Sequence, residues 1–370
     1  MGKEKYSRVV IGGGIFGVYA SLVLAKMGHT VLLLEQDPRI MNRASFVNQA
    51  RLHTGLHYPR SLITASESLR YYNAFRSRFP GAIKDFKQIY AVSKHNSKTS
   101  GRDFQDFISR LGINSREIDS SQYFRKEMIS RSFEVEEPTF DANILRLQLM
   151  EELENCESID LKLNTCVTKG LIGETSKLQL DNGQEIETGG VVIAVYAGTN
   201  SLRVKLGLSM LPLNFELTEV NLGRVAPSMH GLGFTIMDGP FWSLMPFGNT
   251  NLVSLTSVGL TPLRRSSGLP IFDCQEKRTG CNDTKLADCG TCNVRPASTL
   301  MHKIQQMSQF LKNDNCFTPT KSLLTVKSKL STSQVDDARP TLILKENSKN
   351  IWTVFSGKIS TLFDLEEALN

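Results

Sequence analysis

The sequence predicts an α/β fold in which a parallel-sheet domain receives an inserted, mixed and largely antiparallel β-sheet domain. Three observations support this prediction. The first 35 residues read as strand, helix and strand, with a glycine-rich turn after the first strand. From Leu213 to Val258 the pattern changes to alternating, β-rich segments that are typical of antiparallel strands. With 370 residues the chain is also longer than one hydrophobic core usually supports, so we expect two domains.

The opening strand–helix–strand unit has clear boundaries. Residues 8–11 form a short β-branched apolar run, which predicts a buried parallel strand. Residues 15–27 carry apolar side chains at helical spacing, and Gly28 stands where a C-terminal cap belongs. Residues 30–34 form the next apolar strand, which ends at Glu35.

The later elements follow from the same two periodicities. We expect helices at 66–79, 142–154 and 299–311, strands at 88–93, 161–168, 190–194, 251–258 and 351–355, and a final helix from about Thr361. The parallel-sheet domain is expected to comprise residues 1–70, 141–205 and 335–370. The inserted domain then comprises 71–140 and 206–334, with a cysteine-rich loop at 273–295.

Composition excludes several classes of protein. The formal net charge is +6, and no run of five or six Lys or Arg occurs, so the basic excess favours anionic ligands and predicts no nucleic-acid partner. We find neither a signal peptide nor an apolar run near the roughly 18 residues of a spanning helix. The seven cysteines are an odd number, which favours reduced thiols and a cytoplasmic location.

The glycine-rich turn matches a dinucleotide fingerprint. Gly12 allows a tight turn, Gly14 lets the backbone approach a pyrophosphate, and Gly17 lets helix and strand pack closely. The helix that opens at Ile15-Phe16 presents free N–H groups to the phosphates. Glu35 lies where an acid accepts hydrogen bonds from the ribose hydroxyls.

Four stretches together resemble the D-amino-acid-oxidase superfamily of FAD-dependent oxidoreductases, which includes glycine oxidase, sarcosine oxidase and L-2-hydroxyglutarate dehydrogenase. The stretches are the fingerprint with Glu35, residues 42–58, residues 140–198 and residues 337–359. The resemblance implies a Rossmann-type domain with bound FAD. It further implies that FAD contacts Arg43, Ala44, Ser45, Asn48, Val167, Ala197, Gly198, Arg339, Gly357, Lys358 and Ile359.

The chain departs from the family pattern at two places. Many members carry Gly-His-Gly before the last helix, where this chain has Gly357-Lys358. Their Ala-x-Gly-Ala after the strand at 190–194 is replaced by Ala194-Val195-Tyr196-Ala197. We expect a helix beginning near Thr361, with Lys358 beside it, to stabilise the negative charge of a reduced flavin. Thr361 and Asp364 fit a capping box, and the alternative is a plain surface helix.

A second cluster suggests a substrate site. His53, His57, Tyr58 and Arg60 lie close together with Arg51, and such groups can supply a base, a hydrogen-bond donor and an anion clamp. The alternative is a structural role beneath the flavin.

The loop at 273–295 contains four cysteines. Cys274, Cys281, Cys289 and Cys292 could hold a structural zinc ion, although only the last pair has a common metal-ligand spacing. Disulfides and unpaired thiols are the alternatives.

These features favour an FAD-dependent oxidoreductase that oxidises a small amine or amino acid, with oxygen or another compound as electron acceptor. The spacing His53-x-Gly55-x-x-Tyr58 favours an alternative, a 2-hydroxyacid dehydrogenase. A third hypothesis is a non-catalytic FAD-binding or scaffold protein with the thiol loop as its interaction surface.

Overall fold

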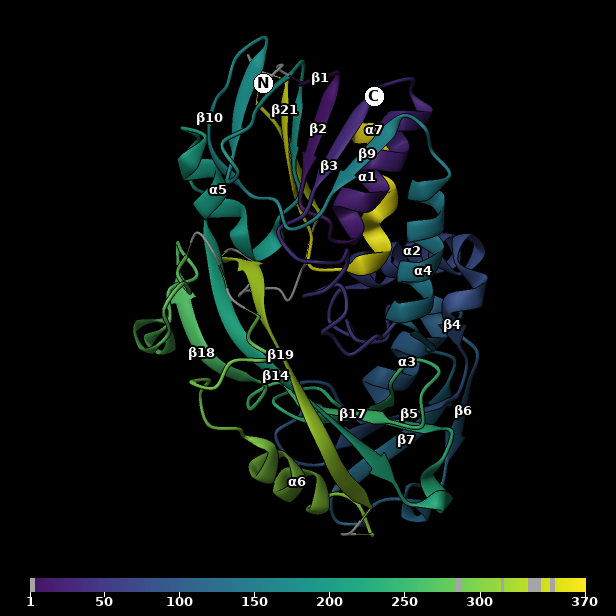
Figure 1. The fold of residues 1–370 in the computed structure, drawn as a ribbon. Helices are drawn as coiled ribbons and strands as arrows, with labels where there is room; N and C mark the ends of the chain where they lie inside the picture. Colours follow the sequence, from purple (N-terminus) through teal and green to yellow (C-terminus); the bar gives the residue numbers. More distant parts are fainter. Residues whose placement is uncertain (1–3, 284–285, 287, 314–315, 332–340, 347–349) are drawn as a thin grey trace.

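The computed structural model describes residues 4–283, 286, 288–313, 316–331, 341–346 and 350–370. Two large sheets dominate it, one near the top of the view in Figure 1 and one near the bottom. The upper sheet has the strand order β20-β21-β13-β2-β3-β9. Its strands are β2 (Arg8–Ile11), β3 (Val31–Leu34), β9 (Ile159–Lys162), β13 (Val191–Ile193), β20 (Leu342–Lys345) and β21 (Ile351–Phe355).

All strands of the upper sheet run parallel except β20, which is antiparallel to β21. Alternate side chains of a strand face opposite sides of a sheet. Accordingly, Val10 packs into a core to which helices contribute residues, whereas Val9 and Ile11 pack into a second core on the other face. The contributing helices include α1 (Ile15–Lys26), α4 (Ala142–Glu154) and α7 (Asp364–Ala368).

A small sheet and a short helix cover the second face of the upper sheet. The strand order is β1-β12-β11-β10, and the bounds are β1 (Glu4–Tyr6), β10 (Val167–Leu171), β11 (Ser176–Leu180), β12 (Glu185–Thr188) and α5 (Thr199–Lys205). Apolar residues of this layer, including Val167 and Leu202, are buried against Val9 and Ile11. The upper sheet is therefore covered on both faces, as parallel sheets require.

The lower sheet follows the order β18-β14-β17-β16-β15-β5-β7-β6, and β19 also pairs with β14. Its strands are β5 (Lys87–Ser93), β6 (Ser115–Ile118), β7 (Ile129–Val135), β14 (Leu213–Val225), β15 (Leu232–Met237), β16 (Trp242–Pro246), β17 (Val253–Ser257), β18 (Pro262–Ser267) and β19 (Phe317–Leu330). Neighbours are antiparallel except β5 and β15, which are parallel. The mixed, largely antiparallel sheet is thus confirmed.

Three further helices complete the fold. Helix α3 (Gly101–Leu111) packs on one face of the lower sheet and α6 (Leu300–Ser308) on the other. Helix α2 (Leu62–Arg78) contributes Phe75 to the core under the upper sheet, and a two-stranded ribbon pairs β4 (Ile83–Lys84) with β8 (Thr139–Phe140). Lys303 of α6 is buried and donates to Glu219 O and Asn221 Oδ1 of β14, at 3.0 and 2.7 Å.

The structure corrects one expected strand. The run at 161–168 is divided between β9 and β10, which belong to different sheets. Asn164 adopts a left-handed backbone (φ 51°), so the chain turns between the two strands. The expected domain borders stay a prediction, and the border after residue 70 lies within α2. Among the described residues, no helix is both long and apolar enough to cross a bilayer.

Candidate functional site

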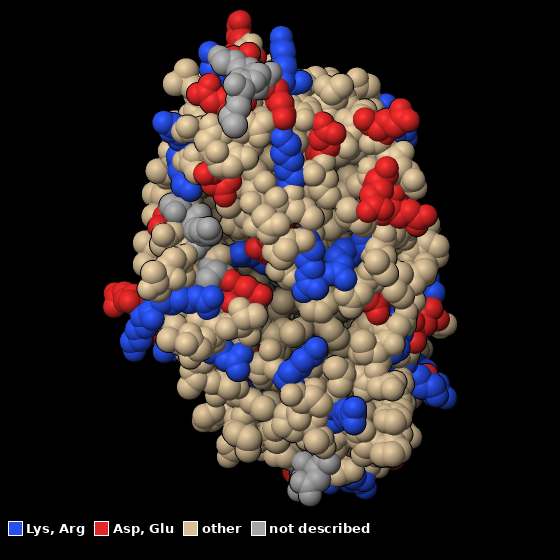
Figure 2. All heavy atoms as spheres, in the orientation of Figure 1, with Lys and Arg blue, Asp and Glu red and all other residues tan. Residues whose placement is uncertain are grey.

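A cavity of about 340 Å³ lies where the fingerprint turn, the 36–53 loop, strand β19 and the 354–359 segment meet. Figure 2 shows a hollow near the middle of one face of the molecule, with Lys and Arg side chains beside it. Most of the expected cofactor contacts line this cavity: Gly12, Gly14, Ile15, Phe16, Glu35, Arg43, Ala44, Ser45, Asn48, Val167, Ala197, Gly198, Gly357, Lys358 and Ile359. Arg339 lies outside the described residues.

The three fingerprint glycines have different physical roles. Gly12 has φ +107°, and a Cβ there would lie 2.5 Å from Ala194 O. A Cβ on Gly17 would lie 1.8 Å from Gly12 O, so Gly17 serves helix–strand packing and does not line the cavity. A Cβ on Gly14 would meet only Ser45 Oγ, at 3.5 Å, and would otherwise enter the cavity. This open space at the start of α1 fits a pyrophosphate, since backbone N–H groups and the helix dipole favour anions there.

Side chains beside α1 are held in place by backbone contacts. The Ile15 N–H donates to Ser45 Oγ at 3.1 Å. The Glu35 carboxylate accepts from the Gly13 N–H at 2.6 Å and from the Asp37 N–H at 2.7 Å. Burial raises the pKa of Glu35. Glu35 therefore lies at the cavity wall where the ribose of a dinucleotide is expected.

Arg43 is fixed by a residue that the sequence analysis missed. Its Nε and Nη2 donate to the two carboxylate oxygens of Asp37, both at 2.8 Å. Burial alone would raise the pKa of Asp37, but hydrogen bonds and charge from Arg43 outweigh it and lower the pKa. Both residues line the cavity. The sequence signal for this pairing was the position of Asp37, two residues after Glu35 and six residues before Arg43.

The C-terminal segment differs from its expected form. A 3-10 turn at Ile359–Phe363 precedes the short α7, and the expected capping box is not formed because Thr361 Oγ1 donates to Lys358 O. Lys358 is nevertheless at the cavity wall. Its Nζ donates to Ser68 Oγ at 3.0 Å and lies 4.3 Å from the Tyr58 ring centroid.

Of the four predicted catalytic residues, His53 lines the cavity, and His57, Tyr58 and Arg60 are not among its described lining residues. The His53 ring lies 5.5 Å from that of His57 and 6.0 Å from that of Tyr58. Arg60 is partly exposed and donates to Asp238 Oδ2 at 3.0 Å. The catalytic roles of these residues stay predictions.

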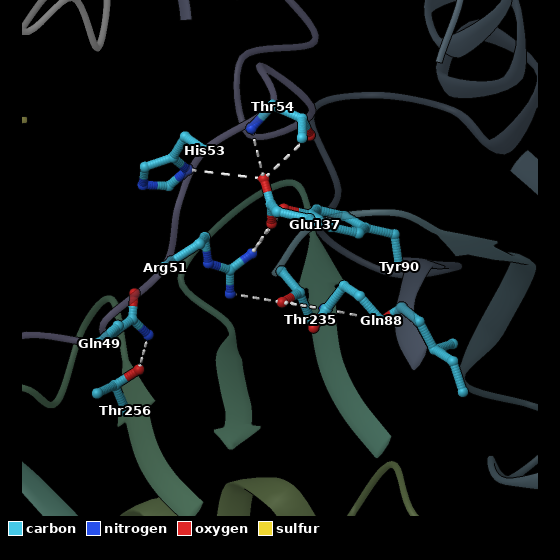
Figure 3. A network of polar contacts seen from close by, with 10 residues as sticks. Gln49, Arg51, His53, Thr54, Gln88, Tyr90, Glu137, Thr235 and Thr256 are labelled. Carbon is cyan, nitrogen blue, oxygen red and sulfur yellow. Dashed lines mark hydrogen bonds and ion pairs between the residues drawn. The ribbon is translucent and has the colours of Figure 1, made fainter. Parts of the chain in front are cut away.

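Arg51 also lines the cavity, but its charge is compensated by the buried carboxylate of Glu137 (Figure 3). Its Nη1 donates to Glu137 Oε2 at 2.7 Å and to Tyr90 OH at 2.6 Å, and its Nη2 donates to Thr235 Oγ1 at 2.7 Å. The side chains of Arg51 and Glu137 are 1% and 0% exposed. Burial pulls the pKa of Arg51 down, but Tyr90 and Glu137 outweigh it and the net shift is upward. Arg51 is therefore a structural cation rather than an available anion clamp.

Strand β19 supplies a wall that the sequence analysis also missed. Leu324, Thr325, Val326 and Lys327 line the cavity. The sequence analysis assigned no element to this segment. Its long pairing with β14 brings it to the cavity.

The four loop cysteines surround a second cavity of about 20 Å³. None of them forms a disulfide. Burial raises the pKa of Cys289 to about 12, and the neighbouring thiols add to the shift. Among the described residues, no three His, Cys, Asp or Glu side chains are grouped so as to hold a metal ion. Leu286 and Cys289 line both cavities, so the loop forms part of the wall of the larger one.

Comparison with known proteins agrees with this geometry. The model of a family described as "FAD dependent oxidoreductase" matches residues 8–240. "FAD-dependent monooxygenase kojA" of Aspergillus flavus is 28% identical over 255 residues, which cover 65% of this chain and 58% of that protein. "FAD-dependent monooxygenase FPY4" of Fusarium mangiferae is 31% identical over 109 residues, 29% of this chain and 30% of that protein. The matches thus span less than two thirds of these curated relatives.

Solved structures share the fold. Glycine oxidase from Geobacillus kaustophilus has a TM-score of 0.70 at 14% identity, covering 99% of this chain and 93% of that one. NikD, described as an unusual amino acid oxidase, has a TM-score of 0.70 at 16% identity, covering 99% and 93%. L-alpha-glycerophosphate oxidase from Mycoplasma pneumoniae with FAD bound has a TM-score of 0.69 at 11% identity, covering 99% and 94%.

Proposed function

The chain belongs to the FAD dependent oxidoreductases, and on that premise we propose that it oxidises a small amine or amino acid. One observation carries the proposal: a single cavity extends from the glycine-rich turn to His53 and Lys358. A dinucleotide turn and ionisable side chains in one cavity can hold a redox cofactor against a small substrate. Family membership also favours an enzyme over a scaffold protein.

Several parts of the wall suit the parts of FAD. The N–H groups at the start of α1 bind the pyrophosphate, with Arg43 nearby as a fixed cation. Glu35 accepts hydrogen bonds from the ribose, and Val167 lies at the adenine end. When bound, FAD would supply the two-electron acceptor for oxidation of the substrate.

His53 and Lys358 act on the substrate side in this proposal. His53 takes a proton from the substrate, because an ammonium group must lose a proton before its carbon can give up a hydride. The Lys358 ammonium, held by Ser68 and Tyr58, attracts negative charge in the cavity, either on a substrate carboxylate or on the reduced cofactor. His57 and Tyr58 support the His53 ring through their aromatic contacts.

A second candidate is a 2-hydroxyacid dehydrogenase. The observation in its favour is an imidazole at the cavity wall, because a hydroxyl is a much weaker acid than an ammonium and needs a base more strongly. The electron acceptor would be oxygen or another oxidant in either case.

A substrate screen under anaerobic conditions tests the proposal. Purified protein with FAD is mixed with D- and L-amino acids, N-methyl amino acids and 2-hydroxyacids, and bleaching of the flavin absorbance is followed. Bleaching by amines supports the proposal, and bleaching by hydroxyacids alone selects the second candidate. If no member of any class bleaches the flavin, both assignments are wrong.

We further propose that Cys274, Cys281, Cys289 and Cys292 bind a structural zinc ion. In support, all four line one small cavity whose volume is of the order of a single ion or water. Zinc would require the thiols to move closer together and to lose their protons. A reducing, cytoplasmic location is part of the same proposal, because it would keep these thiols available for metal.

A further inference from the structure

Glu137 is a completely buried carboxylate that directly underlies the cavity wall. It lies on the connection between β7 and β8, away from the loop that carries His53. Its Oε2 accepts hydrogen bonds from Arg51 and Tyr90. Its Oε1 accepts from the Thr54 N–H at 3.2 Å and Thr54 Oγ1 at 3.4 Å, and His53 Nδ1 lies 3.8 Å away. Figure 3 shows the second ring nitrogen of His53 pointing away from Glu137.

We propose that Glu137 is a positioning residue for His53. Its Oε1 keeps the imidazole proton on Nδ1, which leaves Nε2 without a proton and able to accept one from the cavity. The two nitrogens of a neutral imidazole have opposite roles, and the hydrogen bond made by one sets the role of the other. The separation of 3.8 Å is longer than a hydrogen bond, and such contacts commonly shorten when a substrate is bound. This inference rests on the proposed role of His53 as the base.

Arg51 determines whether Glu137 only orients the His53 ring or also stabilises its positively charged imidazolium form. A lone buried carboxylate would favour the imidazolium form, which cannot act as a base. Arg51 Nη1 lies 2.7 Å from the same carboxylate, closer than His53, so the buried pair is almost neutral. Glu137 can therefore keep the single proton of a neutral His53 on Nδ1 without stabilising a second proton on the ring.

Three other described residues lie near His53. His57 lies on the same loop, 5.5 Å away between ring centroids. Tyr58 follows it at 6.0 Å, and Lys358 of the C-terminal segment lies over the Tyr58 ring. Among these described neighbours Lys358 is a cation, and a nearby cation disfavours the imidazolium form.

The test removes the buried pair as a unit, because a single substitution would leave an uncompensated buried charge and could prevent folding. The variant is Arg51→Met/Glu137→Leu. The matched control, Lys303→Met/Glu219→Leu, removes another buried cation–carboxylate pair, which lies outside the cavity wall. Long-range ¹H–¹⁵N correlation spectra of the histidine rings, recorded on FAD-loaded protein without substrate, report the tautomer, and His53→Gln assigns the signal.

In the wild-type protein and the control, we expect His53 to carry its proton on Nδ1. In the Arg51→Met/Glu137→Leu variant, the Nε2-protonated form should appear, and kcat for a substrate found in the screen should fall at least about tenfold. A His53 proton on Nε2 in the wild-type protein overturns the proposal, even if the variant fails to fold. An unchanged Nδ1 proton in a folded variant overturns it as well. If the tautomer shifts but His53→Gln retains full turnover, Glu137 orients His53 and the proposed base is wrong.

Discussion

The variant Gly14→Ala separates the role of the glycine-rich turn in folding from its role in FAD binding. Gly14 has φ −67° and ψ 172°, a backbone that alanine adopts without strain. The new methyl group would contact only Ser45 Oγ, at 3.5 Å. We therefore expect the apoprotein to keep its stability or gain up to about 1 kcal/mol, because alanine restricts the unfolded chain.

FAD binding should respond in the opposite direction. The methyl group would occupy the space beside the start of α1 and push the pyrophosphate away from the backbone N–H groups. Losing one hydrogen bond to a charged group costs about 1.5–3 kcal/mol, which raises Kd about 10- to 150-fold. Quenching of flavin fluorescence during titration of the apoprotein measures Kd, and thermal unfolding of the apoprotein measures stability.

Two other glycines provide the comparison. In Gly17→Ala the Cβ would start 1.8 Å from Gly12 O and needs at least 3.0 Å, so α1 must move by 1.2 Å or more (3.0 minus 1.8). This variant should lose about 1–3 kcal/mol of stability even without FAD. Gly81→Ala places its Cβ in open space and should change neither property. Wild-type FAD affinity in a stable Gly14→Ala protein would refute the placement of the pyrophosphate at α1.

Three further predictions concern charged groups and thiols. Lys358→Met should lower the flavin reduction potential by some tens of millivolts and weaken sulfite binding. The reason is that a charge interaction on the order of 1–3 kcal/mol is removed, and 1.4 kcal/mol corresponds to about 30 mV. An unchanged reduction potential would place Lys358 away from the flavin. Asp37 has a lowered pKa, so its contribution to stability is present above about pH 4 and is lost as pH falls through its folded pKa. Asp37→Asn should therefore weaken FAD binding and make the free energy of unfolding less dependent on pH at the acid end. An unchanged pH dependence would contradict the Arg43 pairing. Purified protein should contain about one zinc ion per chain, and the Cys289→Ser/Cys292→Ser variant should contain none. Wild-type protein that is free of metal and equally stable would show that the loop is an insertion without a metal site.

The grouping of the expected cofactor residues around one cavity could be predicted because its information is local, and their contacts with FAD stay a prediction. Gly12, Gly14 and Glu35 lie within one strand–helix–strand unit, and each has a task that follows from its spacing. The position of Lys358 at the wall was expected from the family resemblance. The helix expected to begin at Thr361 was not found in that form, because the Thr361 hydroxyl bonds back to Lys358 O within a 3-10 turn.

The substrate side could not be predicted to the same depth. Glu137 reaches Arg51 across 86 residues and Thr235 reaches it across 184, so nothing in the local sequence marks them as partners. Arg51 looked like an anion clamp because its neutralising partner comes from a distant connection. Lys327 escaped notice for a related reason, since only the pairing of β14 with β19 carries its segment to the cavity.

The position of β21 in the upper sheet has a consequence for how the protein is made. β13 lies between β2 and β21, and its residue Val191 pairs with Ile351, 160 positions later in the chain (351 minus 191). On a ribosome, the fingerprint turn therefore emerges long before the sheet behind it can be completed. Contacts this far apart in sequence form slowly, because a long loop must close before they bring any stabilisation. We expect FAD to be captured after synthesis has passed β21, and a nascent chain halted before residue 351 to leave its core accessible to chaperones.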